Sequence, residues 1–231
     1  MMQQFSSNSM SAPVLVFDLD DTLYLERDFA RSGFAALDDY LNSSRGLAGF
    51  AEACSRKFDA GIRGNIFNAA LEELGCAEED TFIHELVNLY RSHEPRISLA
   101  DDARIFLDNN RQPLALITDG PAATQNAKID GLGIRSTFGH IVTTGAWPKG
   151  FGKPHPRSFK QVMAWSGQKA GDHIYIADNP AKDFLAPRDL GWRTVQINRE
   201  GRVHDPVPPS LAHCADNEIE TLDQLAGVLA L

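Results

Sequence analysis

Cysteine is scarce in this sequence, and neither cysteine nor histidine is arranged for a disulfide framework or a metal site. The 231 residues include three scattered cysteines, Cys54, Cys76 and Cys214. An odd number without ligand-type spacing is typical of free thiols in a reducing compartment. The seven histidines show no metal-type clustering, which argues against zinc. We therefore expect neither a disulfide scaffold nor a zinc protein.

The sequence also lacks a long hydrophobic run. A helix that spans a bilayer needs roughly 20 apolar residues in succession, and no run approaches that length. Residues Met1–Ala12 are polar and rich in serine, without the basic start and apolar centre of a signal peptide. We expect a disordered tail over residues 1–12, a cytoplasmic location and no membrane partner.

Positive charge is in the minority. Twenty-two Lys and Arg residues face 31 Asp and Glu residues, and the formal net charge of −9 argues against a nucleic-acid partner. The content of 43% hydrophobic and 23% charged residues is ordinary for a soluble globular protein. The length allows one full core with a smaller insert, and it indicates no particular oligomeric state.

Five short apolar runs alternate with helix-like segments along the chain. This alternation is typical of an open α/β sheet, in which ligands bind at the carboxyl ends of the strands. The expected strands are Val14–Phe17, Leu114–Ile117, His140–Thr143, Ile174–Ala177 and Thr194–Ile197.

About ninety residues separate the first two runs, far more than one crossover helix needs. The apolar spacing in this interval predicts four helices that form an insert over the strand ends. We therefore expect a Rossmann-like three-layer core with a parallel sheet from residues 13–25 and 95–231, and an α-helical cap over residues 26–94. The four predicted cap helices are Arg27–Leu41, Gly49–Asp59, Asn65–Leu74 and Glu78–Arg91. Further helices are expected at Ser98–Asn109, Pro121–Leu132, Pro156–Trp165, Pro180–Leu190 and Leu222–Leu229, with a loop at Asn198–Pro209.

Three acidic residues follow the first strand: Asp18, Asp20 and Asp21. Clustered carboxylates repel one another, so they require a cation, protons or bulk water. The cluster alone is consistent with a divalent metal site or with an exposed acidic turn. Polar residues also end the second and fourth runs, and this gathering at one edge favours the metal site.

Four separate segments carry the polar chemistry of the chain in a fixed order. They are Asp18-x-Asp20-x-Thr22, Thr118-Asp119-Gly120, Gly152-Lys153-Pro154 and Asp178-Asn179-Pro180-x-x-Asp183. Together they resemble the four motifs of the haloacid dehalogenase-like (HAD) hydrolase superfamily, over roughly residues 13 to 200. The resemblance extends to the helical-cap (C1-type) phosphatase branch, because the predicted insert lies where that cap belongs. One departure is Ala177, where the family often has glycine.

The resemblance implies roles for the first motif. The family's first aspartate, here Asp18, attacks phosphorus and forms an aspartyl-phosphate, which divides one difficult step into two. Asp20 lies on the same side of an extended chain and is placed to act as general acid and then general base. Thr22 corresponds to the residue that fixes the turn. Asp21 has no catalytic role and is expected to face solvent or to cap the turn.

A transferred phosphoryl group needs cations and N–H groups around its oxygens. Thr118, the amides of Asp119 and Gly120, and the ammonium of Lys153 are suited to this task. The alternative for Lys153, a solvated loop lysine, is disfavoured by its place between glycine and proline.

The resemblance also implies Mg²⁺ as cofactor. The expected ligands are Asp18, the backbone carbonyl of Asp20, and Asp178. Asp183 is expected first to support these ligands from behind, reaching the site through water, and second to bind the metal directly. Asn179 is placed beside the site and is equally suited to cap a helix.

Other polar and aromatic residues have simpler explanations. His155 is expected in a surface loop, and the three tryptophans, Trp147, Trp165 and Trp192, are expected to pack. Arg63 and Asn65 lie between two predicted cap helices. They are placed either to contact the non-phosphate end of a substrate or to form a solvated loop, and the loop is the simpler explanation.

The sequence thus predicts a Mg²⁺-dependent phosphatase for a small phosphorylated metabolite, with sugar phosphates as the first class to test. A phosphomutase shares the same core and is the main alternative. A haloacid dehalogenase is disfavoured because such members lack the second aspartate, here Asp20. A phosphonatase needs a cap lysine, for which Lys57 is the only candidate. A non-enzymatic binding module is disfavoured because every catalytic position is filled.

Overall fold

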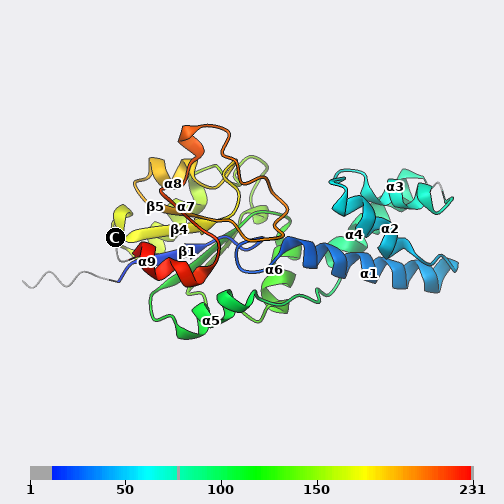
Figure 1. Cartoon of the computed structure of the whole chain (residues 1–231), viewed down its shortest axis with the longest axis horizontal. Helices are drawn as coiled ribbons and strands as arrows, with labels where there is room; N and C mark the ends of the chain where they lie inside the picture. Colours follow the sequence, from blue (N-terminus) through cyan, green and yellow to red (C-terminus); the bar gives the residue numbers. More distant parts are fainter. Residues whose placement is uncertain (1–11, 77–78, 230–231) are drawn as a thin grey trace, which may run out of the picture.

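A six-stranded parallel sheet organises the larger part of the molecule (Figure 1). The computed structural model describes residues 12–76 and 79–229. The strand order is β3-β2-β1-β4-β5-β6, and every neighbouring pair is parallel. The strands are β1 Val14–Phe17, β2 Leu114–Thr118, β3 His140–Thr143, β4 His173–Ala177, β5 Arg193–Ile197 and β6 Asn217–Ile219.

Strand β1 lies in the middle of the sheet. Strands β2 and β3 are added on one side of it, and β4, β5 and β6 on the other. Leu15 is in register with Leu114 of β2 on one side, and Val14 with His173 of β4 on the other. This is the topological switch point at which α/β sheets form their ligand sites. The residues that follow β1 and β4 therefore emerge side by side at the same edge.

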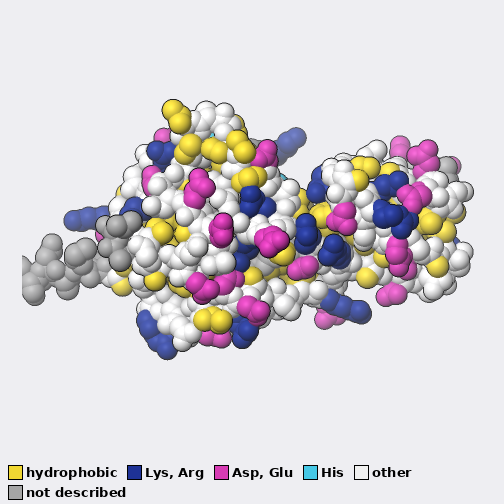
Figure 2. All heavy atoms as spheres, in the orientation of Figure 1, with side chains coloured by type: hydrophobic (Ala, Val, Ile, Leu, Met, Phe, Trp, Pro, Cys, Tyr) yellow, Lys and Arg dark blue, Asp and Glu magenta, His cyan; other side chains and the backbone are white. Residues whose placement is uncertain are grey.

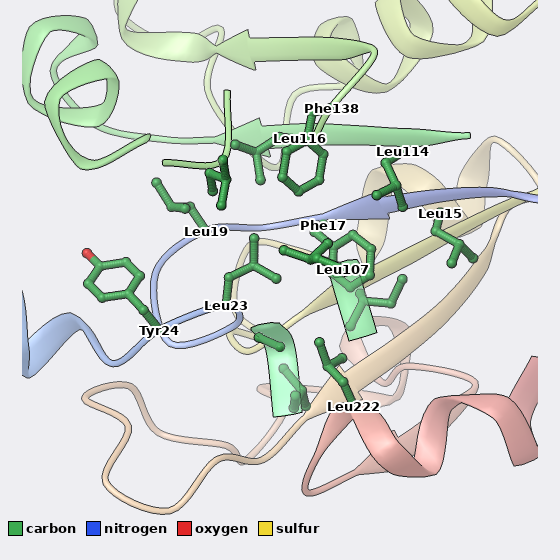
Figure 3. Packing of buried hydrophobic residues seen from close by; sticks show 14 of the residues in the cluster. Leu15, Phe17, Leu19, Leu23, Tyr24, Leu107, Leu114, Leu116, Phe138 and Leu222 are labelled. Carbon is green, nitrogen blue, oxygen red and sulfur yellow. The ribbon is translucent and has the colours of Figure 1, made fainter. Parts of the chain in front are cut away.

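Helices cover both faces of the sheet and complete three layers. Alternate residues of β1 point to opposite faces. Leu15 and Phe17 pack with α5, α6 and α9, whereas Val14 and Val16 pack with α7 and α8. Figure 3 shows Phe17 among Leu107, Leu114 and other apolar side chains of the first cluster. The helices are α5 Asp101–Asn109, α6 Ala122–Gly131, α7 Arg157–Ser166, α8 Leu185–Asp189 and α9 Leu225–Leu229. The predicted α/β, Rossmann-like class with a parallel sheet is confirmed.

Four further helices form a unit at one end of the molecule, which we call the helical insert (residues 26–92; Figure 1). Its core is separate from both sheet clusters and includes Phe34, Leu41, Phe50, Phe67 and Leu86. The polypeptide chain enters the insert directly after the acidic segment that follows β1. The four helices are α1 Glu26–Arg45, α2 Phe50–Asp59, α3 Ile66–Glu73 and α4 Asp80–Ser92.

Several predicted helices differ from the structure by three or four residues at one end, and two elements differ more strongly. The predicted helix Pro180–Leu190 is wrong over its first half, because residues 180–184 form turns and bends and α8 begins only at Leu185. The Asp183 carboxylate accepts a hydrogen bond from the Asn179 amide at 3.1 Å, which holds this segment in a turn. Strand β6 was not predicted, because its three residues, Asn-Glu-Ile, are too short and polar to give an apolar run.

Other features agree with expectation or lie outside the described part. The three cysteines are free thiols. Within residues 12–76 and 79–229, every helix is too short or too polar to cross a bilayer. The expected N-terminal tail lies outside the described residues, apart from Ala12.

Candidate active site

Lys153 lies at the centre of a buried polar cluster at the carboxyl edge of the sheet. Its ammonium donates to Asp18 Oδ1 at 2.8 Å and to the Tyr175 hydroxyl at 2.9 Å, and it lies 2.7 Å from Asp183 Oδ1. Burial disfavours the charged ammonium, but the carboxylates of Asp18 and Asp183 more than offset this and raise the pKa of Lys153 well above its ordinary value. The cluster therefore holds a fixed positive charge beside Asp18.

Three carboxylates converge beside this lysine. Asp18, Asp178 and Asp183 each place one oxygen within 4.8 Å of the others, and all three residues are buried. Burial, the Lys153 charge that opposes it, and the Asp183 carboxylate together raise the pKa of Asp18 to about 6. For Asp178, burial and the neighbouring carboxylates of Asp18 and Asp183 raise the pKa well above its ordinary value.

This carboxylate group fits a hard divalent cation. Asp178 Oδ2 is buried without a hydrogen-bond partner among the described residues. The donors are all oxygens, which is the ligand set that Mg²⁺ prefers. An unpartnered oxygen amid like charges is the environment that such a cation stabilises.

The loop that carries Lys153 is held by Asp119. The Asp119 carboxylate accepts hydrogen bonds from the Lys153 amide, at 3.1 and 3.2 Å, and from the Thr144 hydroxyl. Its side chain is therefore engaged in the fold, and only its backbone amide remains available for a phosphate. Next to it, the backbone passes Gly145 so closely that a Cβ there would lie 1.9 Å from the Gly120 carbonyl oxygen.

Asp20 is bound by three side chains that the sequence analysis did not identify. Its carboxylate accepts hydrogen bonds from Lys128 Nζ at 2.7 Å, from Gln125 Nε2 at 2.9 Å and from the Tyr24 hydroxyl. Burial raises the pKa of Asp20, but the charge of Lys128 and these donors more than offset it and hold the pKa below its ordinary value. Gln125 also donates to the Thr118 hydroxyl, so the second motif is linked to Asp20.

A sequence signal for Gln125 and Lys128 does exist in α6. Ile129 is the one large apolar residue between Ala122 and Gly131. A helix packed on a sheet buries one face, and with so few apolar residues in α6 some polar side chains must be buried there. Gln125 and Lys128 are 2% and 4% exposed. Buried polar side chains at a spacing of three on such a helix indicate partners at the strand ends.

Asp21 is buried, so the expectation that it faces solvent is wrong, whereas the capping alternative holds. Its carboxylate accepts from the Glu26 amide at 2.8 Å, at the start of α1, and from the Val203 amide at 2.7 Å. Two backbone amides replace water around the charge. Thr22 is also buried, and its carbonyl accepts from Arg199 Nε at 2.8 Å.

A cavity of about 280 Å³ lies in the helical insert, and Arg63 and Asn65 both line it. It is called the insert cavity below. The remaining lining residues are Glu26, Phe34, Phe58, Ile62, Gly64, Ile66, Phe67, Asn68, Ile83, Val87, Tyr90 and Arg91.

Other singled-out residues lie away from the carboxylates. Trp192 stacks on His173, with ring centroids 4.5 Å apart, and Trp165 stacks on His140 at 5.5 Å. Lys57 forms an ion pair with Glu73 within the insert, N to O 2.6 Å. These residues have packing or surface roles.

Comparison with known proteins identifies the class of this fold and site. The family model for haloacid dehalogenase-like hydrolases matches residues 13–191, so the chain belongs to that family. Among solved structures, the magnesium-bound HAD hydrolase YfnB from Bacillus subtilis covers 96% of this chain and 100% of its own, with a TM-score of 0.67 and 21% identity.

The curated relatives are more specific. Phosphoserine phosphatase of Thermus thermophilus is 33% identical over 148 residues, which is 63% of this chain and 58% of that protein. Glyceraldehyde 3-phosphate phosphatase of Methanocaldococcus jannaschii is 26% identical over 93% of this chain and 96% of its own length. Family and relatives together make this chain a phosphoric monoester hydrolase.

Proposed function

We propose that this hydrolase is a Mg²⁺-dependent phosphatase that acts on a small phosphorylated metabolite through an aspartyl-phosphate on Asp18. The observation that carries the proposal is the buried arrangement of Lys153 against Asp18 and Asp183, with Asp178 beside them. It combines a nucleophile, a fixed cation and a cation-binding oxygen set at the end of one central strand. The family and the phosphatase names of the relatives support the same reaction class.

In the first step an Asp18 oxygen bonds to phosphorus as the bond from phosphorus to the leaving oxygen breaks. Thr118, the amides of Asp119 and Gly120, and the Lys153 ammonium bind the phosphoryl oxygens and stabilise the charge that develops there. Lys153 Nζ already lies 2.8 Å from Asp18 Oδ1, so the ammonium can stabilise the phosphoryl group without rearrangement.

Asp20 exchanges the protons. A bound phosphate dianion raises the pKa of a nearby carboxyl group and so favours the acid form, which protonates the leaving oxygen. Once the leaving group has departed, Asp20 accepts a proton from the water that attacks the aspartyl-phosphate. Lys128 lowers the pKa of Asp20 and favours this base form.

Asp18, Asp178 and the Asp20 carbonyl would hold Mg²⁺, with Asp183 and Asn179 behind them and Thr22 in the turn. Bound there, the ion would neutralise phosphate and carboxylate charge. The Asp183 carboxylate is also shared with Lys153 and with the Asn179 amide, which positions it against the other two aspartates.

The helical insert is proposed to act as a cap, residues 26–94, over a catalytic core of residues 13–25 and 95–231. A cap excludes bulk water and favours small substrates, so sugar phosphates are the first class to test. We further propose a cytoplasmic enzyme whose partner is a small phosphate ester rather than nucleic acid or a membrane.

The test is phosphate release from a panel of phosphorylated metabolites and 4-nitrophenyl phosphate, with Mg²⁺ and with excess chelator. We expect release only with Mg²⁺, and its loss in Asp18→Asn. The matched control is Asp39→Asn, which changes an exposed aspartate of α1. Full activity of Asp18→Asn contradicts the mechanism, and isomerised product without free phosphate indicates a phosphomutase.

A further inference from the structure

The insert cavity has an apolar body with a polar edge. Aromatic and aliphatic side chains form most of its wall, including Phe34, Phe58, Phe67, Val87 and Tyr90. Its remaining side chains include two arginines and two asparagines. These four are Arg63, Asn65, Asn68 and Arg91.

The cavity adjoins the catalytic end of the sheet. Its wall residue Tyr90 packs on Phe29 with ring centroids 5.5 Å apart, and Lys128, which binds Asp20, lies 4.3 Å from the centre of that Phe29 ring. On the other side, the Arg91 carbonyl accepts a hydrogen bond from Thr124 of α6 at 3.0 Å. One continuous set of contacts therefore joins the cavity to Asp20.

The polar edge is exposed to solvent, and its side chains keep donors that no other described residue accepts. Within the described part of the chain, the Arg91 guanidinium has neither a hydrogen bond nor an ion pair. Arg63 lies over the Phe58 ring and donates through Nη1 to the Phe58 and Ile62 carbonyls, which leaves Nε and Nη2 without a partner among the described residues. Asn65 is the N-cap residue of α3, yet its side chain makes no capping bond.

The charge around the cavity is positive on balance. Arg63 and Arg91 carry two positive charges against one acidic side chain, Glu26. Burial and the Asp20 carboxylate raise the pKa of Glu26 to about 7, which reduces its negative charge near neutral pH. On the face drawn in Figure 2, Lys and Arg side chains lie among Asp and Glu side chains where the insert meets the rest of the molecule, so the positive balance is a property of the cavity lining and not of the whole junction.

We propose that the insert cavity binds the non-phosphate part of the substrate, and that this part carries a carboxylate held by Arg91 and Arg63. Guanidinium groups bind carboxylates in a planar, two-pronged geometry. The mostly apolar wall favours a group with a single charge over a dianion, because desolvation costs more as charge increases. The inference rests on the proposed phosphatase activity and adds a substrate class to it.

The test compares two aryl phosphates that differ only at the far end of the ring, 4-carboxyphenyl phosphate and 4-carbamoylphenyl phosphate. For each, kcat/KM is measured with wild type, Arg91→Met, Arg91→Lys and Arg63→Met. Arg104→Met is the control, because Arg104 is exposed on α5, paired with Asp101 and outside the cavity. The ratio of the two kcat/KM values removes any general effect of a substitution on catalysis.

We expect Arg91→Met to lower the ratio of carboxylate to amide by about tenfold, the effect of losing one charge-assisted hydrogen bond. Arg63→Met should lower the ratio by less, since Arg63 already donates to two carbonyls. Arg91→Lys should retain part of the wild-type preference for the carboxylate, and Arg104→Met should leave the ratio unchanged. An unchanged ratio in both Arg91→Met and Arg63→Met overturns the inference while leaving the phosphatase intact. If the protein hydrolyses neither aryl phosphate and no member of the metabolite panel, the proposed function itself is contradicted.

Discussion

Lys128 donates a 2.7 Å hydrogen bond to Asp20, although the two residues lie 108 positions apart in the chain. Lys128 is 4% exposed and also rests over the Phe29 ring of α1. Asp20 is thereby tied to α6 of the core and, through Phe29, to the first helix of the insert. The proposed acid/base residue is held by side chains from both parts of the molecule.

Replacing Lys128 by methionine should lower kcat by about 10- to 100-fold, within the range that one positioned acid or base supplies. The Asp20 carboxylate would lose its fixed position and the charge that favours its base form. KM should change less, because Lys128 is not proposed to contact the substrate. The measurement is steady-state kinetics on the substrate found in the panel.

Lys128→Arg should recover part of kcat, since a cation returns to the site, whereas Lys160→Met on α7 should behave as wild type. Melting temperatures of all variants separate loss of fold from loss of catalysis. An unchanged kcat in a folded Lys128→Met protein would show that the ion pair has no part in catalysis.

In metal-free protein, Asp178→Asn should be stabilising, by on the order of 1 kcal/mol. The substitution removes one of three converging carboxylates, and Asp178 Oδ2 has no partner among the described residues to lose. Mg²⁺ should raise the melting temperature of wild type but have little effect on this variant. Thermal unfolding with chelator and with Mg²⁺ measures both effects.

The contrast is Asp216→Asn. Asp216 Oδ2 accepts hydrogen bonds from the Thr194 amide and hydroxyl, and the carboxylate also pairs with Arg188. Loss of its charge should weaken these interactions, destabilise the protein and leave the response to Mg²⁺ intact. A Mg²⁺ response of wild-type size in Asp178→Asn would exclude Asp178 as a ligand.

Gly145→Ala should damage the site through the backbone. A Cβ would lie 1.9 Å from the Gly120 carbonyl oxygen, so the loops that carry Thr144 and Gly120 must separate. We expect a loss of about 1–3 kcal/mol in stability, as for other overpacked positions, together with weaker phosphate binding. Urea unfolding and KM measure the two effects. Gly171→Ala, where nothing lies within 4 Å, should be close to neutral, and equal behaviour of the two variants would refute the steric explanation.

His173 should make the protein less stable as pH falls below about 6.5, the ordinary pKa of histidine. Burial lowers the pKa of its imidazole in the folded state, so the unfolded chain takes up a proton at a pH where the folded chain does not. The ring is fully buried between Ser166, the Lys169 carbonyl and the Trp192 ring. This contribution is present above pH 6.5 and is lost on acidification.

Urea unfolding at pH 7.5 and pH 5.5 measures the slope. His173→Gln should lower stability at pH 7.5 but flatten its decrease toward pH 5.5. His84→Gln, on the exposed face of α4, is the control. A slope in His173→Gln equal to that of wild type would assign the acid sensitivity to other groups.

The sequence determined the class of fold and, to within one residue, the ends of five strands of the six-stranded sheet. Apolar runs of four or five residues are a local property, and β1, β2, β3, β4 and β5 lie at or within one residue of the predicted runs. Parallel strands place their carboxyl ends on one edge, so chain order was enough to bring Asp18, Thr118 and Asp178 together. Lys153 could be predicted as a site residue only from its motif, Gly152-Lys153-Pro154, because its loop has no hydrophobic periodicity.

Tertiary structure decided which partner each charge would have. Asp20 and Asp21 are neighbours with the same side-chain chemistry, yet one binds Lys128 and Gln125 of α6 and the other binds the amides of Glu26 and Val203. Local periodicity cannot encode a contact between side chains a hundred residues apart, since it depends on how α6 and the 198–209 loop pack against the first turn. The insert cavity, formed where α1 to α4 meet, arises in the same way.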